Sequence, residues 1–391
     1  MSETEQAVGI VRRPPRKVAG LDDCLFYHTI EVPGFGLVPG FWDLRGGEAE
    51  YLGRVPLAGR RVLEIGPASG HLTFYMEAQG ADVISVEAAD VSGWELHFDL
   101  YDERPADLRE YLASSDDALR RIVNSYWLCH RAFDSKAGVY YGSVNSVPRG
   151  LGDFDISVLG CVLLHSKNPL RILEHCARAT RDAVVVVEPV REWMLAQTPI
   201  EFLQRGRARW WDTWWGFSPK YFVDVLRGMG FGDARVTFHT QTAFGRPVHL
   251  FTVVARRGEL DLDRRPAGPL RVEFDTPVER LRLAAGELTH LPVRVRVVSG
   301  GPVSSTSDPP LLLSYHWRDE SGGLAVWDGL RTPLPRPLFD GEREEVVVAV
   351  EAPAGPGRYR LEITLLTEGL LWHEDRIPGL PLCIEAAVVA G

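Results

Sequence analysis

Up to about residue 257, short continuous apolar runs alternate with stretches whose apolar residues recur every three or four positions. Continuous apolar runs are typical of parallel strands buried on both faces, and the second spacing is typical of amphipathic helices. The alternation predicts an α/β domain with a doubly wound sheet that binds ligands at the carboxyl ends of its strands. Strands are predicted at 61–65, 82–87, 139–144 and 184–188, and in a closing hairpin at 234–239 and 248–255. A further strand, together with the segment that follows it, is predicted at 154–165. Helices are predicted at 72–79, 168–177 and 220–229.

From residue 269 the pattern changes to short alternating strands without helices, separated by turns rich in Gly, Pro, Asp and Ser. This pattern predicts a C-terminal all-β sandwich domain of immunoglobulin-like type. Its strands are expected at 270–274, 291–298, 311–318, 345–352, 358–366 and 382–389. The predicted organisation is a flexible arm at 1–20, the α/β domain at 21–257, a charged linker at 258–268 and the sandwich at 269–391.

A glycine-containing turn with acidic flanks follows the first predicted strand. Residues 61 to 70 read Arg-Val-Leu-Glu-Ile-Gly-Pro-Ala-Ser-Gly, and glycine lets backbone N–H groups approach a ligand because it has no Cβ. A dinucleotide site has the spacing G-x-G-x-x-G. Here Glu64 comes two residues before Gly66, where a carboxylate would repel a pyrophosphate and attract a cation. Glu87 ends the second strand and is placed to hold two ribose hydroxyls.

This turn resembles motif I of the class I S-adenosylmethionine-dependent methyltransferases. The resemblance implies a Rossmann-like seven-stranded sheet and S-adenosylmethionine (SAM) as the cofactor; another α/β turn or an NAD site is the alternative. Where the family often has an aspartate that accepts from the adenine N6, this chain has Ser143, which leaves adenine recognition to Ser143 and the Val144 backbone. The cofactor-binding residues implied are Glu64, Gly66, Pro67, Ala68, Gly70, Glu87, Ala88, Ser143, Val144, Gly160 and Cys161.

Three N-terminal stretches make the resemblance more specific: Phe-Tyr-His-Thr-Ile at 26–30, Pro-Gly-Phe-Trp-Asp at 39–43, and the run from Leu57 to Gly66. Together they are similar to a branch of methyltransferases related to the enzymes that carboxymethylate the tRNA wobble uridine. In that branch the N-terminal segment closes over the cofactor. The chain departs from the branch around 41–51, where the lysine-glycine element for the carboxylated cofactor is missing.

Methyl transfer from a sulfonium is an in-line displacement, and a hydroxyl acceptor must also lose its proton to a base. The first candidate for this base is His165, since the end of the fourth strand faces the transferable methyl in this fold. His28, in the closing segment, is the second candidate and Glu188 the third. His71 is interpreted as part of a helix start.

An insertion at 91–138, with helices predicted at 107–112 and 117–128, is placed to cap the acceptor pocket. Aromatic side chains in this insertion and elsewhere could contact the acceptor, although ordinary packing explains each of them equally well or better. The candidate acceptor-binding residues are Tyr27, Trp127, Trp214 and Trp215.

Composition restricts the partners and the compartment. The net charge of −10 over 391 residues is unfavourable for a nucleic-acid partner, whose affinity depends on cationic contacts with phosphates. The five scattered cysteines include no C-x-x-C pair, so they indicate neither a zinc site nor a disulfide framework and fit a cytoplasmic protein. No histidine and carboxylate cluster has metal-ligand spacing, and no apolar run reaches membrane-spanning length. We therefore expect no metal and no membrane contact, and a homodimer is possible.

The function favoured by these features is O-methylation of a sugar hydroxyl on a glycan or a glycosylated small molecule. One alternative is carboxymethylation or methylation of the tRNA wobble uridine, and another is a catalytically idle glycan-binding or scaffold protein. The C-terminal domain resembles small sandwich domains attached to bacterial glycan-processing proteins. Its Trp317, Trp327 and Trp372 could stack on sugar rings, although a structural or dimerising module is slightly favoured.

Overall fold

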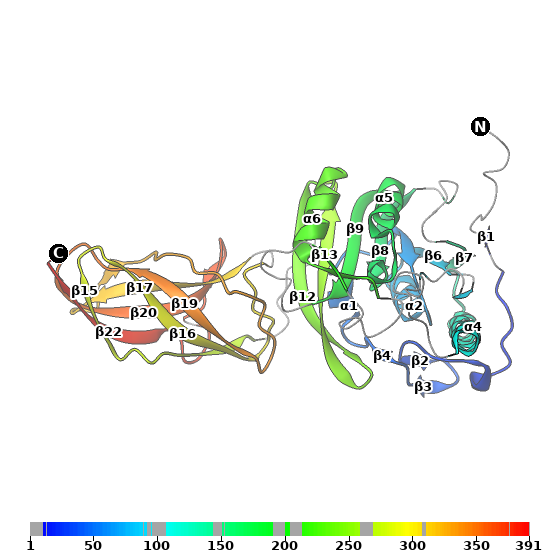
Figure 1. Cartoon of the computed structure of the whole chain (residues 1–391), viewed down its shortest axis with the longest axis horizontal. Helices are drawn as coiled ribbons and strands as arrows, with labels where there is room; N and C mark the ends of the chain where they lie inside the picture. Colours follow the sequence, from blue (N-terminus) through cyan, green and yellow to red (C-terminus); the bar gives the residue numbers. More distant parts are fainter. Residues whose placement is uncertain are drawn as a thin grey trace. The chain divides into compact units, whose positions relative to one another are not determined.

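The computed structural model of the protein describes residues 11–12, 14–88, 90–91, 95, 107–143, 151, 153–190, 200–203, 213–258, 269–306, 310–374 and 376–390. The chain forms two compact units, Met1–Asp263 and Arg264–Gly391 (Figure 1). Most of the predicted arm and nearly all of the predicted linker lie outside the described residues, so both remain predictions.

The first unit is built on one mixed sheet of nine strands in the order β1-β7-β6-β5-β8-β9-β13-β12-β4. β5 to β9 run parallel to one another, whereas β12 and β13 form a hairpin whose strand β13 pairs antiparallel with β9. The expected count of seven strands is wrong, because two-residue strands extend both edges: β1 pairs with β7, and β4 pairs with β12. The strands are β1 (Val11–Arg12), β4 (Trp42–Asp43), β5 (Arg61–Ile65), β6 (Asp82–Glu87), β7 (Gly138–Tyr141), β8 (Phe154–Gly160), β9 (Thr180–Pro189), β12 (Asp233–Ala243) and β13 (Arg246–Arg256).

Two helices of the first unit begin at a residue whose side chain caps them. Asp107 accepts a hydrogen bond from the Glu110 amide at 2.9 Å, and Ser218 caps the last helix in the same way through Tyr221. Pro219 takes the first helical position, where its missing N–H costs nothing. The helices are α1 (Glu48–Tyr51), α2 (His71–Ala78), α4 (Leu108–Ala132), α5 (Pro169–Ala179) and α6 (Pro219–Gly228), with short 3₁₀ turns η2 (Leu21–Asp23) and η6 (Leu163–His165).

The insertion contains one continuous helix, α4, where two helices are predicted. The stretch at 113–116, which separates the two predicted helices, continues the helix as an exposed or half-exposed segment. Beyond it, Leu119, Val123 and Tyr126 recur at spacings of three and four and are buried against the sheet. Packing of this face explains why the helix does not break.

Two further strand pairs lie outside the large sheet. β2 (Ile30–Val32) and β3 (Gly36–Val38) form a hairpin in the N-terminal segment, and β10 (Ile200–Phe202) pairs with β11 (Trp215–Phe217). Neither pair is among the strands predicted from the sequence. In the described part of the chain, no helix combines the length and the apolar character needed to cross a membrane.

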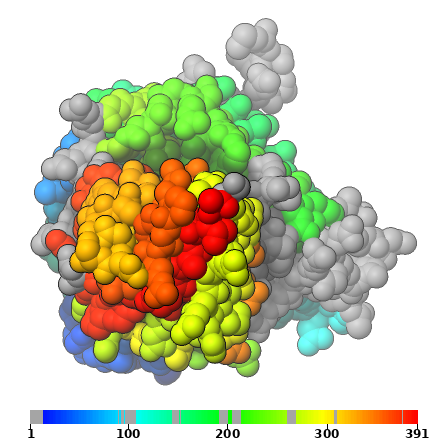
Figure 2. Space-filling view, turned by 90° about the vertical axis from the view of Figure 1, so that its left-hand side faces the viewer, coloured from blue at the N-terminus to red at the C-terminus, as the bar shows by residue number. Residues whose placement is uncertain are grey.

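The second unit contains two separate sheets. Three strands form one, in the order β14-β16-β19, and the other has the order β15-β22-β20-β17-β18 with β21 beside β20. Strands of both sheets form the face shown in Figure 2, coloured yellow to red. The strands are β14 (Arg271–Asp275), β15 (Arg280–Ala284), β16 (Leu288–Ser299), β17 (Leu311–Asp319), β18 (Leu324–Val326), β19 (Arg343–Glu351), β20 (Gly357–Thr367), β21 (Leu371–Trp372) and β22 (Leu382–Val389).

Alternate residues of both sheets meet in one apolar core. Trp317 belongs to this core, with no exposed surface and its indole N–H donating to the Glu351 carbonyl at 2.8 Å. The suggestion that Trp317 stacks on a sugar is therefore wrong. The six predicted strands are found, and β15, β18 and β21 are additional; the immunoglobulin-like topology stays a prediction.

Candidate functional site

The turn between β5 and α2 has an unusual backbone. Gly66, Ala68 and Gly70 all have positive φ angles, of 74°, 48° and 83°. An added Cβ on Gly66 would lie 2.8 Å from Cγ2 of Val162, and one on Gly70 would lie within 2.8 Å of the ring of Phe74. Only glycine fits these two positions without displacing a neighbour. The turn therefore presents its backbone at the carboxyl edge of the sheet, directly before the N-terminus of α2.

Glu87 stands at the end of the adjacent parallel strand, β6. Its two carboxylate oxygens accept from the Ala68 amide at 3.2 Å and from the Ala88 amide at 2.8 Å. Burial raises the pKa of Glu87, and the two amide hydrogen bonds oppose that rise. The turn and Glu87 are therefore joined directly, and the predicted cofactor residues Ala68 and Ala88 contribute through their backbones.

Glu64 lies beneath the turn rather than on its surface. The side chain is only 3% exposed, and one of its oxygens accepts from the hydroxyls of Thr73 at 2.5 Å and Ser85 at 2.8 Å. These bonds tie β5 to α2 and β6. Burial raises the pKa of Glu64 to about 7, against the effect of both hydroxyls. The hydrogen bonds of Glu64 to Thr73 and Ser85 thus hold the turn in place, and direct attraction of a cation stays a prediction.

The raised pKa of Glu64 predicts a pH-dependent stability. The folded chain binds the proton more tightly than the unfolded chain does, so stability should fall as pH rises from about 4.5 to about 7. At 1.36 kcal/mol per pKa unit, the loss is about 3 kcal/mol. Glu64→Gln keeps an oxygen for the two hydroxyls and does not titrate. Urea unfolding across this window should show a smaller decline for the variant, and equal declines in both proteins would contradict the assignment.

The N-terminal segment lies against the same turn. The Tyr27 amide donates to the Ser69 hydroxyl at 2.7 Å, and Ser125 of α4 donates to that same hydroxyl at 2.8 Å. Trp42 anchors the segment from the other side, since it exchanges backbone hydrogen bonds with Tyr27 and Thr29. Ser69 therefore links the turn, the N-terminal segment and α4. Tyr27, a predicted acceptor-binding residue, is half-buried at this junction.

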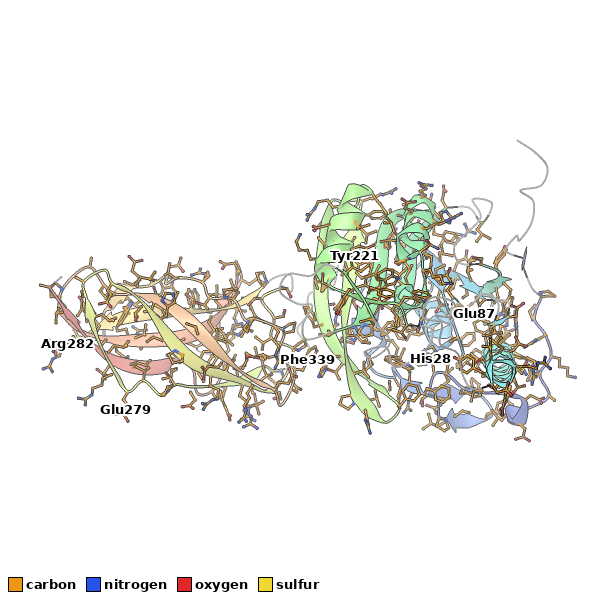
Figure 3. All side chains as sticks on the ribbon, viewed as in Figure 1. His28, Glu87, Tyr221, Glu279, Arg282 and Phe339 are labelled. Carbon is orange, nitrogen blue, oxygen red and sulfur yellow. The ribbon has the colours of Figure 1, made fainter. Side chains whose placement is uncertain are left out.

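Next to Tyr27, His28 is a buried imidazole (Figure 3). The residue is 8% exposed, and its Nδ1 has no hydrogen-bond partner among the described residues. Burial, with a smaller contribution from His71, lowers the pKa of His28 to about 3. A neutral imidazole with a free ring nitrogen can accept a hydrogen bond from a bound ligand, and an orphaned buried polar atom needs such an explanation.

His71 lies close to His28, with 6.0 Å between the two ring centroids. Nε2 of His71 is 3.1 Å from Oε1 of Glu48, the first residue of α1. Burial lowers the pKa of His71, while Glu48 raises it. A carboxylate that holds one ring nitrogen fixes the orientation of the imidazole and favours its protonated form. Glu48 and His71 thus form an acid–histidine pair beside the turn, in addition to the helix-start role predicted for His71.

The carboxyl end of β8 contributes Gly160 and Cys161. Cys161 has a positive φ of 52°, uncommon for a residue with a side chain. An added Cβ on Gly160 would lie 2.7 Å from the Tyr51 hydroxyl, which is also 3.7 Å from the sulfur of Cys161. Tyr51 is 4% exposed, and burial raises its pKa well above the ordinary value. Tyr51 therefore places a neutral hydroxyl at the end of β8.

Glu188 positions the turn that carries His165. It is 1% exposed, and its Oε1 accepts from the amides of Leu163 and Leu164 at 3.1 and 3.4 Å. These are the first residues of η6, which ends at the half-buried His165. The contacts of Glu188 fit support of this turn better than proton transfer, and the proposed role of His165 as a base stays a prediction.

The tryptophans predicted to contact the acceptor differ in exposure. Trp127 is 2% exposed and donates to the Tyr141 hydroxyl at 3.1 Å inside the core, which fits a packing role, and its acceptor contact stays a prediction. Trp214 is 5% exposed and donates to the Glu95 carbonyl. Only Trp215 is half-buried, held beside the η6 turn by a 2.8 Å bond to the Ser166 carbonyl. Trp215 therefore remains a candidate for acceptor contact.

Ser143 follows β7, beside the end of β6. The backbone joins these strand ends, since the Gly142 amide donates to the Glu87 carbonyl at 3.0 Å. Ser143 is half-buried there, whereas Val144 lies outside the described residues. Pro67, within the turn, accepts from the Gly70 amide at 2.8 Å. Among the residues that the structure places, no group of three histidine, cysteine or acidic side chains could hold a metal ion.

Ser69, Glu48 and Tyr51 are contributors that the sequence analysis misses. Ser69 lies inside the quoted motif, and its position between two glycines was the available signal. Glu48 and Tyr51 are the first and last residues of the short helix α1, and nothing in its sequence indicates their contacts with His71 and Cys161. Long-range packing alone brings them to the site.

Neither a protein-family model nor a curated protein matches this sequence. Comparison with solved structures gives weak likenesses, at low identity and with low TM-scores. The N-terminal domain of EvdMO1, determined in the presence of SAH and D-fucose, is 17% identical with a TM-score of 0.36, over 60% of this chain and 92% of that one. Magnesium protoporphyrin IX methyltransferase (ChlM) from Synechocystis, with bound SAH, is 10% identical with a TM-score of 0.32, over 51% and 75%.

A third match is 1,6-didemethyltoxoflavin-N1-methyltransferase from Burkholderia thailandensis with bound 1,6-didemethyltoxoflavin and S-adenosylhomocysteine. It is 15% identical with a TM-score of 0.32, over 55% of this chain and 78% of that one. Likenesses of this size do not identify a function, so the function has to come from the residues of the site.

Proposed function

We propose that the protein is a SAM-dependent methyltransferase. One observation supports the proposal most strongly. The turn at Gly66–Gly70, with its positive φ angles, is hydrogen-bonded through the Ala68 amide to the carboxylate of Glu87, at the carboxyl ends of two parallel strands. A turn of this kind supplies backbone N–H groups, and the acid on the next strand suits a ribose diol. The nine-stranded sheet holds the turn and Glu87 on its neighbouring parallel strands β5 and β6, which supports the proposal.

The described residues fit the cofactor. Positive φ angles at Gly66, Ala68 and Gly70 set the conformation of the turn, and its backbone would hold the methionine part of SAM. Glu87 would hold the ribose and Ser143 the adenine. When bound, SAM supplies a methyl group on a positively charged sulfur. The half-buried ring of Tyr27 and the hydroxyl of Tyr51 would border this region.

The chain itself has to orient the acceptor and accept its proton. Alignment of the reacting atoms can contribute about 7–11 kcal/mol, and a base roughly 10²–10⁴-fold in rate. We place His165 as the base, with Glu188 as the residue that positions its turn. His71 is the alternative base, because Glu48 orients its ring. His28, neutral and with an unpartnered Nδ1, would accept a hydrogen bond from the bound ligand.

The acceptor we propose is a sugar hydroxyl on a glycan or glycosylated small molecule. Half-buried aromatic rings at Tyr27 and Trp215 offer apolar faces beside hydrogen-bonding groups, a combination that suits a sugar ring. The net charge of −10 is unfavourable for tRNA. The five free cysteines fit a cytoplasmic location.

Transfer of a tritiated methyl group from SAM tests this function. The protein is incubated with methyl glycosides of glucose, galactose, mannose and fucose, and in parallel with tRNA. Label in a sugar ether, lost in Glu87→Ala, is the expected result. Label in tRNA alone, or none in any glycoside, would overturn the sugar acceptor. Failure to bind SAM would overturn the whole assignment.

A further inference from the structure

The six-stranded sheet of the second unit has an unusual outer face. On β17, Leu313, Tyr315 and Trp317 point into the shared core, so the residues between them lie on the opposite face. Such a face normally meets water. Here Ser314 has no exposed surface and His316 only 1%. On the neighbouring strand β20, Glu362 and Thr364 are buried in the same way, at 4% and 0%.

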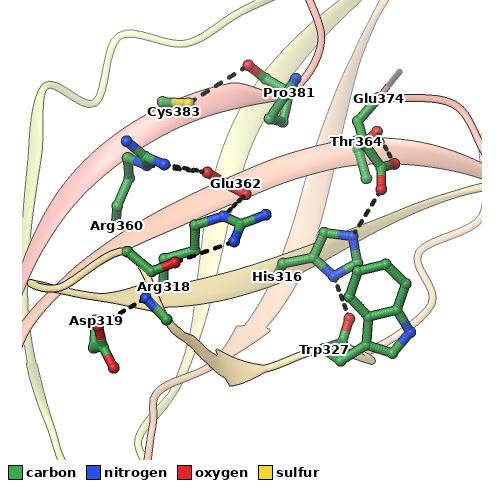
Figure 4. A network of polar contacts seen from close by, with 12 residues as sticks. His316, Arg318, Asp319, Trp327, Arg360, Glu362, Thr364, Glu374, Pro381 and Cys383 are labelled. Atoms are coloured by element: carbon green, nitrogen blue, oxygen red, sulfur yellow. Dashed lines mark hydrogen bonds and ion pairs between the residues drawn. The ribbon is translucent and has the colours of Figure 1, made fainter. Parts of the chain in front are cut away.

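Two tryptophans cover His316: Trp327 directly follows β18, and Trp372 is the last residue of β21. The ring of Trp327 stacks on it at 4.3 Å with 13° between the planes, and Trp372 approaches it at 4.2 Å. The two indole rings are 5.5 Å apart. One nitrogen of His316 contacts the Trp327 carbonyl, and the other lies 3.5 Å from the Glu374 carboxylate (Figure 4). The buried histidine therefore fixes the orientation of the indole above it.

Trp327 is 49% exposed although one of its faces lies on His316, so a large part of a rigidly held aromatic ring meets solvent. Charged groups surround the pair of indoles. Arg331 lies 5.4 Å from the ring centre of Trp372 and pairs with Asp328 at 2.5 Å and Glu368 at 3.0 Å. The site thus combines a flat aromatic surface with hydrogen-bond donors and acceptors at its edge.

We propose that this face binds the ring of a neutral sugar, stacked on Trp327, with Arg331, Asp328 and Glu374 bonding its hydroxyls. A sugar ring has one face of C–H groups, which suits the electron-rich face of an indole, and a rim of hydroxyls, which suits paired charged groups. A cover that served only to shield the sheet would not need a buried polar histidine beneath an exposed ring. The site belongs to the second unit alone and does not depend on the methyl-transfer function.

The test is calorimetric titration of the full chain with the methyl glycosides of glucose, galactose, mannose and fucose, each up to about 10 mM. A signal is expected for at least one, since even a Kd near 1 mM corresponds to about 4 kcal/mol of binding free energy. Trp327→Ala should weaken that binding at least about tenfold, because truncation of a central tryptophan removes the main contact. Trp327→Phe keeps an aromatic face and should retain part of it.

Leu324→Ala is the matched control, because Leu324 is 48% exposed on the adjoining strand β18. This variant should bind the glycosides as tightly as the unmodified protein does. SAM binding, measured separately, should be equal in all four proteins, which separates this site from the first unit. Failure of all four glycosides, or equal affinity in Trp327→Ala, would overturn the proposal. Binding of choline in place of the sugars would also overturn it, since that would make the site an aromatic cage for cations.

Discussion

Gly66→Ala is expected to destabilise the first unit by roughly 2–5 kcal/mol and to weaken SAM binding at least about 30-fold. The φ of 74° at Gly66 is costly for any residue with a side chain. The new methyl group would also lie 2.8 Å from Cγ2 of Val162, a β-branched side chain with little freedom to move away. Denaturant unfolding and calorimetry with SAM measure the two effects.

Gly59→Ala is the matched control for this variant. Gly59 has nearly the same φ, 70°, but a Cβ there would meet nothing within 4 Å. It should therefore lose only about 1 kcal/mol of stability from the backbone conformation and keep its affinity for SAM. Equal SAM affinity in the two variants would contradict the placement of the cofactor on the Gly66 turn.

Glu87→Ala is expected to weaken SAM binding by roughly 10- to 100-fold, the equivalent of about 1.5–3 kcal/mol for hydrogen bonds to a charged group. The variant removes the carboxylate proposed to hold the ribose, and it also releases the amides of Ala68 and Ala88. Calorimetric titration with SAM and with S-adenosylhomocysteine, which carries the same ribose, should show similar losses.

Asp82→Ala is the matched control, because it removes an acid at the opposite end of the same strand. The Asp82 side chain is 68% exposed and forms an ion pair with Arg61, with 3.6 Å between Oδ2 and Nε. An exposed pair of this kind contributes little, so SAM affinity should not change. A loss in Asp82→Ala as large as that in Glu87→Ala would show that the effect comes from damage to β6 rather than from a ribose contact.

Local patterns predicted the elements of the first unit better than its contacts. The strand predicted at 82–87 is found as β6 at those residues, and the helix predicted at 220–229 is found as α6 one residue earlier. Both have strong local signals, an apolar run and a Ser-Pro start. The break predicted within α4 is wrong, because polar residues at 114–117 lie on its solvent side and the buried face continues beyond them.

The site contains contacts between residues that are far apart in the sequence, and these could not be predicted. The turn and Glu87 could be recognised because their residues are close along the chain. The Tyr51 hydroxyl reaches Cys161 across 110 positions, and no local pattern encodes such a contact. Trp317 is a different case, since its alternation with Leu313 and Tyr315 already indicated a core position. That signal was available in the sequence.

Calorimetric titration of the unmodified protein with SAM, beside the Glu87→Ala variant, tests the central claim most directly. We expect a saturable heat with one equivalent of SAM that is strongly weakened in the variant, and no heat with NAD. Binding of NAD in place of SAM, or SAM binding that is unaffected by loss of the Glu87 carboxylate, would contradict it.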